Sequence, residues 1–183
     1  MACVCSFVVS LIVAPPIIRK LISIKAGQPL RTAEEVNELA QLHDSKVGTP
    51  TMGGAIIVSS VMLSVLLFAR LSNPFVLVVV FVFIGLSFVG FLDDYKKVKE
   101  KNSKGISAKT KLSLQVLVSL VAGLFLYLNK DTSEFITKLY VPFNKNPIIE
   151  DMGIMCIPFF VLIVVGCSNA VNLTDGLDGL AIG

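Results

Sequence analysis

Two adjacent aspartates, Asp93 and Asp94, are the residues of this chain best suited to chemistry. They lie in the stretch Phe91–Lys97 (FLDDYKK), at the end of a long apolar run. Two neighbouring carboxylates favour a compensating cation, so the pair suits a divalent metal or a general base. Adjacent side chains on a regular helix diverge by about 100°, so we expect one ion to reach both only at a helix end or break. A solvated helix C-terminus is the alternative, although acidic residues there oppose the helix dipole.

A second polar cluster, Lys46–Gly54 (KVGTPTMGG), leads directly into an apolar run. Its glycines allow close backbone approach, and Pro50 fixes one φ angle. Free N–H groups at a helix start favour an anion, and Lys46 with hydroxyls such as that of Thr51 suits a phosphate. A turn and helix cap, flanked by a basic residue, explains the same pattern.

A third cluster, Asn169–Gly179 (NAVNLTDGLDG), repeats a polar residue every third position. The repeating residues are Asn169, Asn172, Asp175 and Asp178. On a helix they form a slanting polar stripe, whereas Gly176 and Gly179 are equally compatible with a helix break. Polar residues at membrane depth are expensive and usually mark a site. A turn between two helices is the alternative.

Membrane-spanning helices must position these clusters. Hydrophobic residues make up 54% of the 183 residues and charged residues 16%, and the mean hydropathy is +0.80. These values exclude an ordinary soluble domain and a disordered chain. Five charge-free runs each have the length of a membrane span. They are Ala2–Ile18, Val47–Ala69, Leu71–Leu92, Leu112–Asn129 and Met152–Thr174. We therefore predict an all-α, polytopic transmembrane helical bundle with five spanning helices, forming one integral membrane domain over residues 1–183.

The basic residues predict the orientation of this bundle. Twelve of the sixteen Lys and Arg residues lie in two stretches, Arg19–Lys46 and Asp93–Lys111. The positive-inside rule places these stretches in the cytoplasm and the N-terminus outside. All three polar clusters then share the cytoplasmic face. We expect the first run to be a spanning helix and not a secretory signal peptide, because no basic residue precedes it and Arg19 and Lys20 follow it. Pro15 and Pro16 predict a kink in it.

The remaining segments give weaker predictions. Thr32 and Glu35 form a capping-box pattern that predicts a short amphipathic helix in the first cytoplasmic loop. The outer stretch Lys130–Asp151 is compatible with a hairpin or an interfacial segment. The last residues, through Gly183, resemble the beginning of a sixth apolar segment. We therefore expect the N-terminal half of a longer protein.

Carboxylates, lysines and amides gathered at a lipid boundary suit Mg²⁺ and a phosphate. The combination favours a membrane enzyme that joins a lipid phosphate to a soluble phosphorylated donor. A transporter or channel fragment is a rival, but it needs polar residues in mid-membrane. A non-catalytic scaffold leaves the acidic motifs unexplained. The net charge of +3 is too small to indicate a nucleic-acid partner.

The three clusters resemble the signature motifs of a known family. KVGTPTMGG, FLDDYKK and NAVNLTDGLDGLA are similar to those of the bacterial phospho-N-acetylmuramoyl-pentapeptide transferases. These form a branch of the polyprenyl-phosphate N-acetylhexosamine-1-phosphate transferases. Related enzymes that use UDP-N-acetylglucosamine share the aspartate pair but usually lack the TPTMGG sequence. The presence of this sequence favours the muramoyl branch.

The resemblance implies a reaction in peptidoglycan synthesis at the cytoplasmic face of the bacterial inner membrane. Phospho-MurNAc-pentapeptide passes from its UDP carrier to undecaprenyl phosphate, giving lipid I and UMP, with Mg²⁺ required. Asp93 would deprotonate or orient the lipid phosphate, with Asp94 beside it, and both would lie near the metal. The implied substrate-binding and metal-binding residues are Lys46, Thr51, Lys97, Asn169, Asn172, Asp175 and Asp178, of which Asn172 lies near the metal and Lys97 and Asp178 near the uridine.

Two departures from the family pattern stand out. The family usually has a Ser before the His of a short GPxSHxxK stretch, and here that position is Leu42, although His43 keeps its spacing to Lys46. The family also has about ten helices, and its later half supplies a third essential aspartate and a His-rich motif that are not in this chain. By resemblance, these residues carry half of a site. The sequence leaves the oligomeric state open, a homodimer included.

Overall fold

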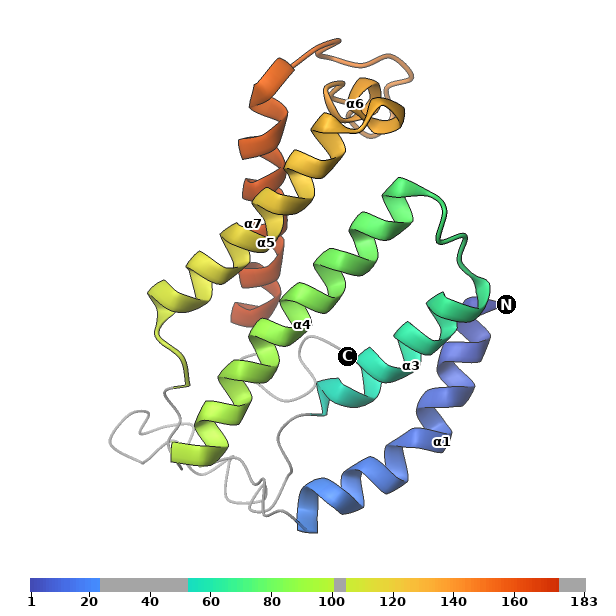
Figure 1. The fold of residues 1–183 in the computed structure, drawn as a ribbon, viewed down its shortest axis with the longest axis vertical. Helices are drawn as coiled ribbons and strands as arrows, with labels where there is room; N and C mark the ends of the chain where they lie inside the picture. The colour runs from blue at the N-terminus through green and yellow to red at the C-terminus, as the bar shows by residue number, and fades with distance from the viewer. Residues whose placement is uncertain (24–52, 101–104, 175–183) are drawn as a thin grey trace. The chain divides into compact units, whose positions relative to one another are not determined.

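A computed structural model describes residues 1–23, 53–100 and 105–174 of the chain, and most of these residues are helical (Figure 1). The elements are α1 (Ala2–Ser23), α3 (Gly54–Phe68), α4 (Pro74–Glu100), α5 (Ala108–Leu128), α6 (Lys130–Ile136), the 3₁₀ turn η2 (Gly153–Met155) and α7 (Cys156–Thr174). Extended pairing within the described ranges is limited to one antiparallel bridge between Leu139 and Ile149. The predicted all-α class is confirmed.

Four helical segments of the described part of the chain are long and apolar enough to cross a membrane. They are Ala2–Leu21, Pro74–Glu100, Ala108–Leu128 and Gly153–Val171. They overlap four of the five predicted runs, with different bounds. The remaining run, Val47–Ala69, contains α3, an apolar helix of 15 residues, while its first residues, 47–52, lie outside the described ranges. The predicted capping-box helix at Thr32 also lies outside them.

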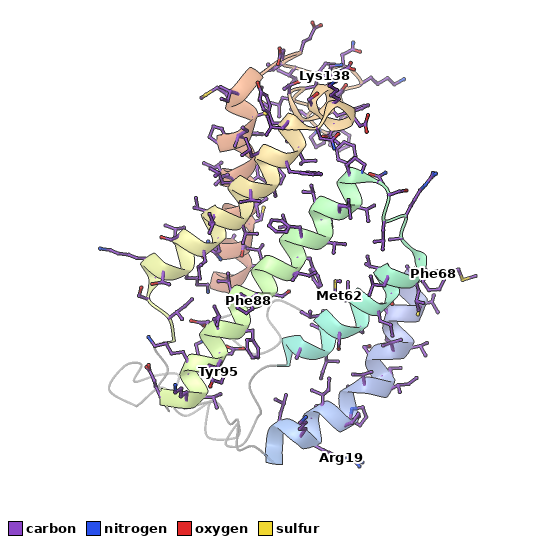
Figure 2. All side chains as sticks on the ribbon, viewed as in Figure 1. Arg19, Met62, Phe68, Phe88, Tyr95 and Lys138 are labelled. Atoms are coloured by element: carbon purple, nitrogen blue, oxygen red, sulfur yellow. The ribbon has the colours of Figure 1, made fainter. Side chains whose placement is uncertain are left out.

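The packing follows the pattern of helices in lipid, where large apolar side chains face outward and small or polar ones lie at contacts. Phe68 and Phe88 are more than half exposed, and side chains stand out along every helix in Figure 2. The fully or nearly buried positions include Ser60, Ser64, Ser119 and Ala122. The hydroxyls of these three serines are satisfied within their own helices, as in the 2.9 Å hydrogen bond from Ser64 Oγ to the Ser60 carbonyl.

The chain divides into two compact units. The first comprises Met1–Arg70 with Leu86–Lys111, and the second Leu71–Gly85 with Leu112–Gly183. In the first unit α1 packs against α3. Helix α1 continues through the adjacent prolines Pro15 and Pro16 and changes direction partway along its length (Figure 1), as expected for residues that remove a helical hydrogen bond.

In the second unit, α5 packs between the first half of α4 and α7. A Cβ atom on Gly85 of α4 would lie 2.7 Å from Val118 of α5, so this glycine permits a close helix approach. Gly123 on α5 has the same role toward α7, where a Cβ would lie 3.2 Å from Phe160. Ala122 lies in the small apolar core of this unit.

The segment between α5 and α7 is folded. Asn129 caps α6 by accepting a hydrogen bond from the Asp131 N–H at 2.9 Å. Two backbone hydrogen bonds form the bridge that closes the following loop: the Leu139 N–H donates to Ile149 O at 2.9 Å, and the Ile148 N–H donates to Leu139 O at 2.8 Å. The stretch Lys130–Asp151 therefore contains α6 followed by a chain reversal closed by one antiparallel bridge, as the hairpin prediction requires for its second part. Its position at the membrane interface stays a prediction.

Candidate active site in the last two turns of α4

The aspartate pair lies inside α4 rather than at its end. The helix continues to Glu100, almost two turns beyond Asp93. The pair therefore lies within a continuous helix, and not at a helix end or break. The continuation is explained by pairs of opposite charge at helical spacing, among them Lys96 with Glu100 at 3.8 Å, and by basic residues in the last turn, which complement the helix dipole.

A single cation nevertheless reaches both aspartates. Lys97 lies four residues after Asp93 and three after Asp94, the two spacings that meet on a helix surface. Its Nζ is 2.6 Å from Asp93 Oδ2 and 3.4 Å from Asp94 Oδ1. An unbroken helix thus lets adjacent carboxylates share a side-chain ammonium, because a cation on the next turn lies between their directions. Whether they share a metal ion stays a prediction.

The two carboxylates differ in their surroundings. The Asp93 side chain is 14% exposed and that of Asp94 36%. Asp93 also accepts a 2.9 Å hydrogen bond from the backbone N–H of Ile106, which lies beyond the end of α4. Lys111, in the first turn of α5, adds a favourable electrostatic interaction. Asp93 is therefore fixed by its neighbours, whereas Asp94 is the more accessible carboxylate.

The third polar cluster begins on α7, in the second unit. The Asn169 side chain donates one amide hydrogen to Gln115 Oε1 on α5 at 2.8 Å and another to the Val165 carbonyl at 2.8 Å. Gln115 in turn donates to Ser168 Oγ at 3.2 Å. Because both hydrogens of the Asn169 amide are used, its remaining capacity is that of an acceptor.

Gln115 was missed by reasoning from the sequence. It is buried on α5, at 3% exposure, and it links α5 to α7. The one available signal was an amide within the otherwise apolar run Leu112–Asn129, where a polar residue needs a partner.

Comparison with known proteins decides the family. Residues 75–183 match the model of glycosyl transferase family 4. The chain belongs to this family. Over 182 residues it is 47% identical to a phospho-N-acetylmuramoyl-pentapeptide-transferase of Methylacidiphilum infernorum, and 44% identical to proteins of the same name from Citrifermentans bemidjiense and Geobacter sp.. These alignments cover all of this chain, and 50%, 48% and 48% of the respective relatives. The chain therefore spans about half the length of the relatives it matches.

The part of the chain that matches the glycosyl transferase family 4 model includes most of the predicted site. Asp93, Asp94 and Lys97 meet in the first unit, and Asn169 lies in the second. Asn172 belongs to α7, whose helical backbone extends to Thr174, so the helical alternative for this cluster holds up to that residue. Four predicted site residues lie outside the described residues: Lys46, Thr51, Asp175 and Asp178.

The donor set of this family member can be tested against Mg²⁺. Within the described ranges no three His, Cys, Asp or Glu side chains gather in one place. Mg²⁺, however, usually takes one or two protein carboxylates and completes its shell with water and substrate phosphates. Asp93 and Asp94, which already converge on one cation, fit that requirement.

Proposed function

We propose that the complete protein transfers phospho-MurNAc-pentapeptide from its UDP carrier to undecaprenyl phosphate, forming lipid I and UMP in peptidoglycan synthesis. The observation that carries this proposal is the 44–47% identity, along the whole chain, to relatives named phospho-N-acetylmuramoyl-pentapeptide-transferase. The cluster of two carboxylates and a lysine supports it, because a phosphoryl transfer depends mainly on positioning and charge neutralisation.

In the proposed reaction, an oxygen of undecaprenyl phosphate attacks the phosphorus that carries the sugar. The bond from that phosphorus to the bridging oxygen breaks, and UMP leaves with the electron pair. Asp93 orients the lipid phosphate or takes its remaining proton. A carboxylate offers about four acceptor positions, of which Lys97 and the Ile106 N–H each use one of those on Asp93. Asp93 therefore keeps acceptor capacity for a substrate.

Mg²⁺, when bound, supplies positive charge that neutralises the phosphates of the two substrates. Asp93, Asp94 and Asn172 would hold it. Lys97 would move from the carboxylates toward the uridine nucleotide, since an ammonium and a divalent cation compete for the same two oxygens. We further propose that Lys46, Thr51, Asn169, Asp175 and Asp178 line the substrate pocket. Asn169 would contribute its acceptor oxygen only.

The proposed place of the reaction is the cytoplasmic face of the bacterial inner membrane. Its support is the unequal distribution of basic residues, with twelve of the sixteen Lys and Arg residues in Arg19–Lys46 and Asp93–Lys111. In this orientation the lipid carrier reaches the last turns of α4 from the bilayer, and the nucleotide donor reaches them from the cytoplasm.

The test is an assay of UMP release by the complete gene product in detergent or nanodiscs, with undecaprenyl phosphate and Mg²⁺. We expect release with UDP-MurNAc-pentapeptide, none after addition of EDTA, and recovery with excess Mg²⁺. Release with UDP-N-acetylglucosamine instead would assign the protein to the related hexosamine branch. Release with neither donor, from folded protein, would contradict the proposal.

A matched pair of variants ties the activity to the aspartate cluster. Asp94→Asn removes one carboxylate of the cluster and should abolish most UMP release. Lys145→Gln removes a charge from the exposed segment between α6 and η2, and should leave UMP release unchanged. Equal effects of the two changes on UMP release would mean that the activity does not depend on the aspartate cluster of α4.

A further inference from the structure

We propose that Gly105 is a positioning residue for Asp93: it lets the segment after α4 close against the Asp93 carboxylate and fix its orientation. Position 105 therefore requires glycine. The part of this inference that concerns turnover rests on the proposed transferase function. The part that concerns the contact between the two residues stands apart from it.

The first step is the backbone at Gly105. Its φ angle is +61°, in the left-handed region that glycine adopts without a steric penalty. The residue is buried, although it lies in the connection between helices α4 and α5, three residues before α5 begins. A buried left-handed residue at a helix connection needs a neighbour that explains its burial.

That neighbour is Asp93. A Cβ atom built on Gly105 would collide with Asp93 Oδ1 and would lie 2.9 Å from Asp93 Cγ. It would also lie 3.0 Å from Cε of Lys97. The lysine chain is flexible and can give way, but the carboxylate is held in place by its other partners. A side chain at position 105 must therefore displace the Asp93 carboxylate.

Ile106, the residue after Gly105, helps to fix the Asp93 carboxylate. The Ile106 N–H donates to Asp93 Oδ1 at 2.9 Å, while Lys97 Nζ holds Oδ2 at 2.6 Å. Each carboxylate oxygen thus has its own donor, and the carboxylate cannot rotate without losing one of them. Asp94 has a more exposed side chain and contacts the same lysine at 3.4 Å. The glycine therefore acts on Asp93 and not on its neighbour.

The segment is anchored on its other side by the start of α5. Ser107 Oγ accepts a hydrogen bond from the Thr110 N–H at 3.2 Å, and Ser107 O accepts one from the Lys111 N–H at 2.9 Å. This is the arrangement of a helix N-cap. Gly105 and Ile106 are thereby tied to α5 two residues further on, so they form a short, fixed strap against Asp93.

The first experiment compares two glycine variants of the complete protein. Gly105→Ala should lower kcat by about 10- to 100-fold, the effect of misplacing a reacting group by about an ångström, with an unchanged KM for the nucleotide donor. Gly90→Ala is the matched control: Gly90 lies three residues before Asp93 on α4, and a Cβ there meets nothing within 4 Å. It should leave both constants unchanged. Wild-type kcat in folded Gly105→Ala protein would overturn the inference.

The second experiment does not use activity. The fall in melting temperature caused by Gly105→Ala is measured in the wild-type and in the Asp93→Ala background. The penalty of the left-handed backbone is present in both, so the comparison isolates the contact with the carboxylate. A smaller fall in the Asp93→Ala background supports the inference, even if the proposed transferase function fails. An equal fall in both overturns it.

A variant that does not accumulate also gives an answer. If Gly105→Ala alone cannot be purified, the double variant Gly105→Ala with Asp93→Ala decides. Recovery to the level of the Asp93→Ala protein identifies the carboxylate as the obstruction and supports the inference. Failure of the double variant, with the Asp93→Ala protein folded, contradicts it.

Discussion

Gln115 of α5 and Asn169 of α7 are joined by a 2.8 Å hydrogen bond between side-chain amides that lie 54 residues apart in the sequence. The bond has a direction. Asn169 is the donor, since the same amide nitrogen also donates to the Val165 carbonyl. Gln115 accepts this bond through its side-chain oxygen and donates through its side-chain nitrogen to Ser168 Oγ. Asn169, the first polar residue of the NAVNLTDGLDG cluster, thus helps to hold α7 against α5.

This relationship predicts a measurable coupling. In a double-mutant cycle of Gln115→Ala and Asn169→Ala, we expect a coupling free energy of about 0.6 kcal/mol, the average for hydrogen bonds between membrane helices, and not above about 1.7 kcal/mol, their maximum. Unfolding of the purified protein in mixed micelles measures it. Ser119→Ala is the control partner, because the Ser119 hydroxyl donates to the Gln115 carbonyl within α5. A Gln115–Asn169 coupling no larger than the Gln115–Ser119 coupling would contradict the assignment.

We expect the Asn variants of the two aspartates to lose activity to a similar extent but to differ in the stability of the folded protein. Asp93→Asn and Asp94→Asn should each reduce turnover by a factor on the order of 10²–10⁴, the usual range for loss of an acid–base group. Asp93→Asn should also destabilise the protein, by about 1 kcal/mol more than Asp94→Asn, since it loses the shorter and more buried interaction with Lys97. UMP release and thermal unfolding of the same samples report both quantities. Near-normal turnover of either variant would remove that residue from the proposed catalytic pair.

The proposed orientation predicts which residues are labelled from outside. In a cysteine-free background of the protein in intact cells, Lys145→Cys should react with a membrane-impermeant maleimide. Lys109→Cys, in the first turn of α5, should react only after permeabilisation. Both positions are exposed, so a difference reports the side of the membrane and not burial. Labelling of Lys109→Cys in intact cells would reverse the orientation drawn from the basic residues.

Much of the helical fold could be predicted from charge alone. The run Met152–Thr174 anticipates η2 and α7, and Leu112–Asn129 anticipates α5 to within a few residues. The end of α4 could not be found this way. A run that stops at the first charge ends at Leu92, but the helix continues through Asp93 to Glu100, because its charges pair at helical spacing and do not interrupt it.

The site was less predictable, since its key contacts depend on tertiary structure. The sequence pointed to Asp93, Asp94 and Lys97 through residue type and spacing. It could not indicate that Gly105 lies against Asp93, because a single glycine after a basic stretch is compatible with many turns. Nor could it indicate that Gln115 meets Asn169, because the faces by which two apolar helices meet depend on their packing, including the close approach at Gly123, and not on spacing along one helix.

The last prediction concerns the cation between the two carboxylates. If Lys97 occupies the place that a divalent ion takes during turnover, Lys97→Gln removes its competitor and increases the local negative charge. The Mg²⁺ concentration that gives half-maximal activity should then fall several-fold, even though maximal turnover drops because the lysine no longer reaches the substrate. Titration of UMP release with Mg²⁺ measures both effects.

Lys96→Gln is the control for this change. Lys96 lies on the same helix and pairs with Glu100 at 3.8 Å, a partly exposed contact one turn further on. It removes the same formal charge from α4, so a general electrostatic effect on Mg²⁺ should appear in both variants, whereas competition at the aspartates should appear in Lys97→Gln alone. An unchanged or higher Mg²⁺ requirement in Lys97→Gln would mean that the ion binds away from Asp93 and Asp94. Lys97 would then hold the two carboxylates throughout turnover, and the metal ligands would have to be sought among the other polar residues of the site, beginning with Asn172.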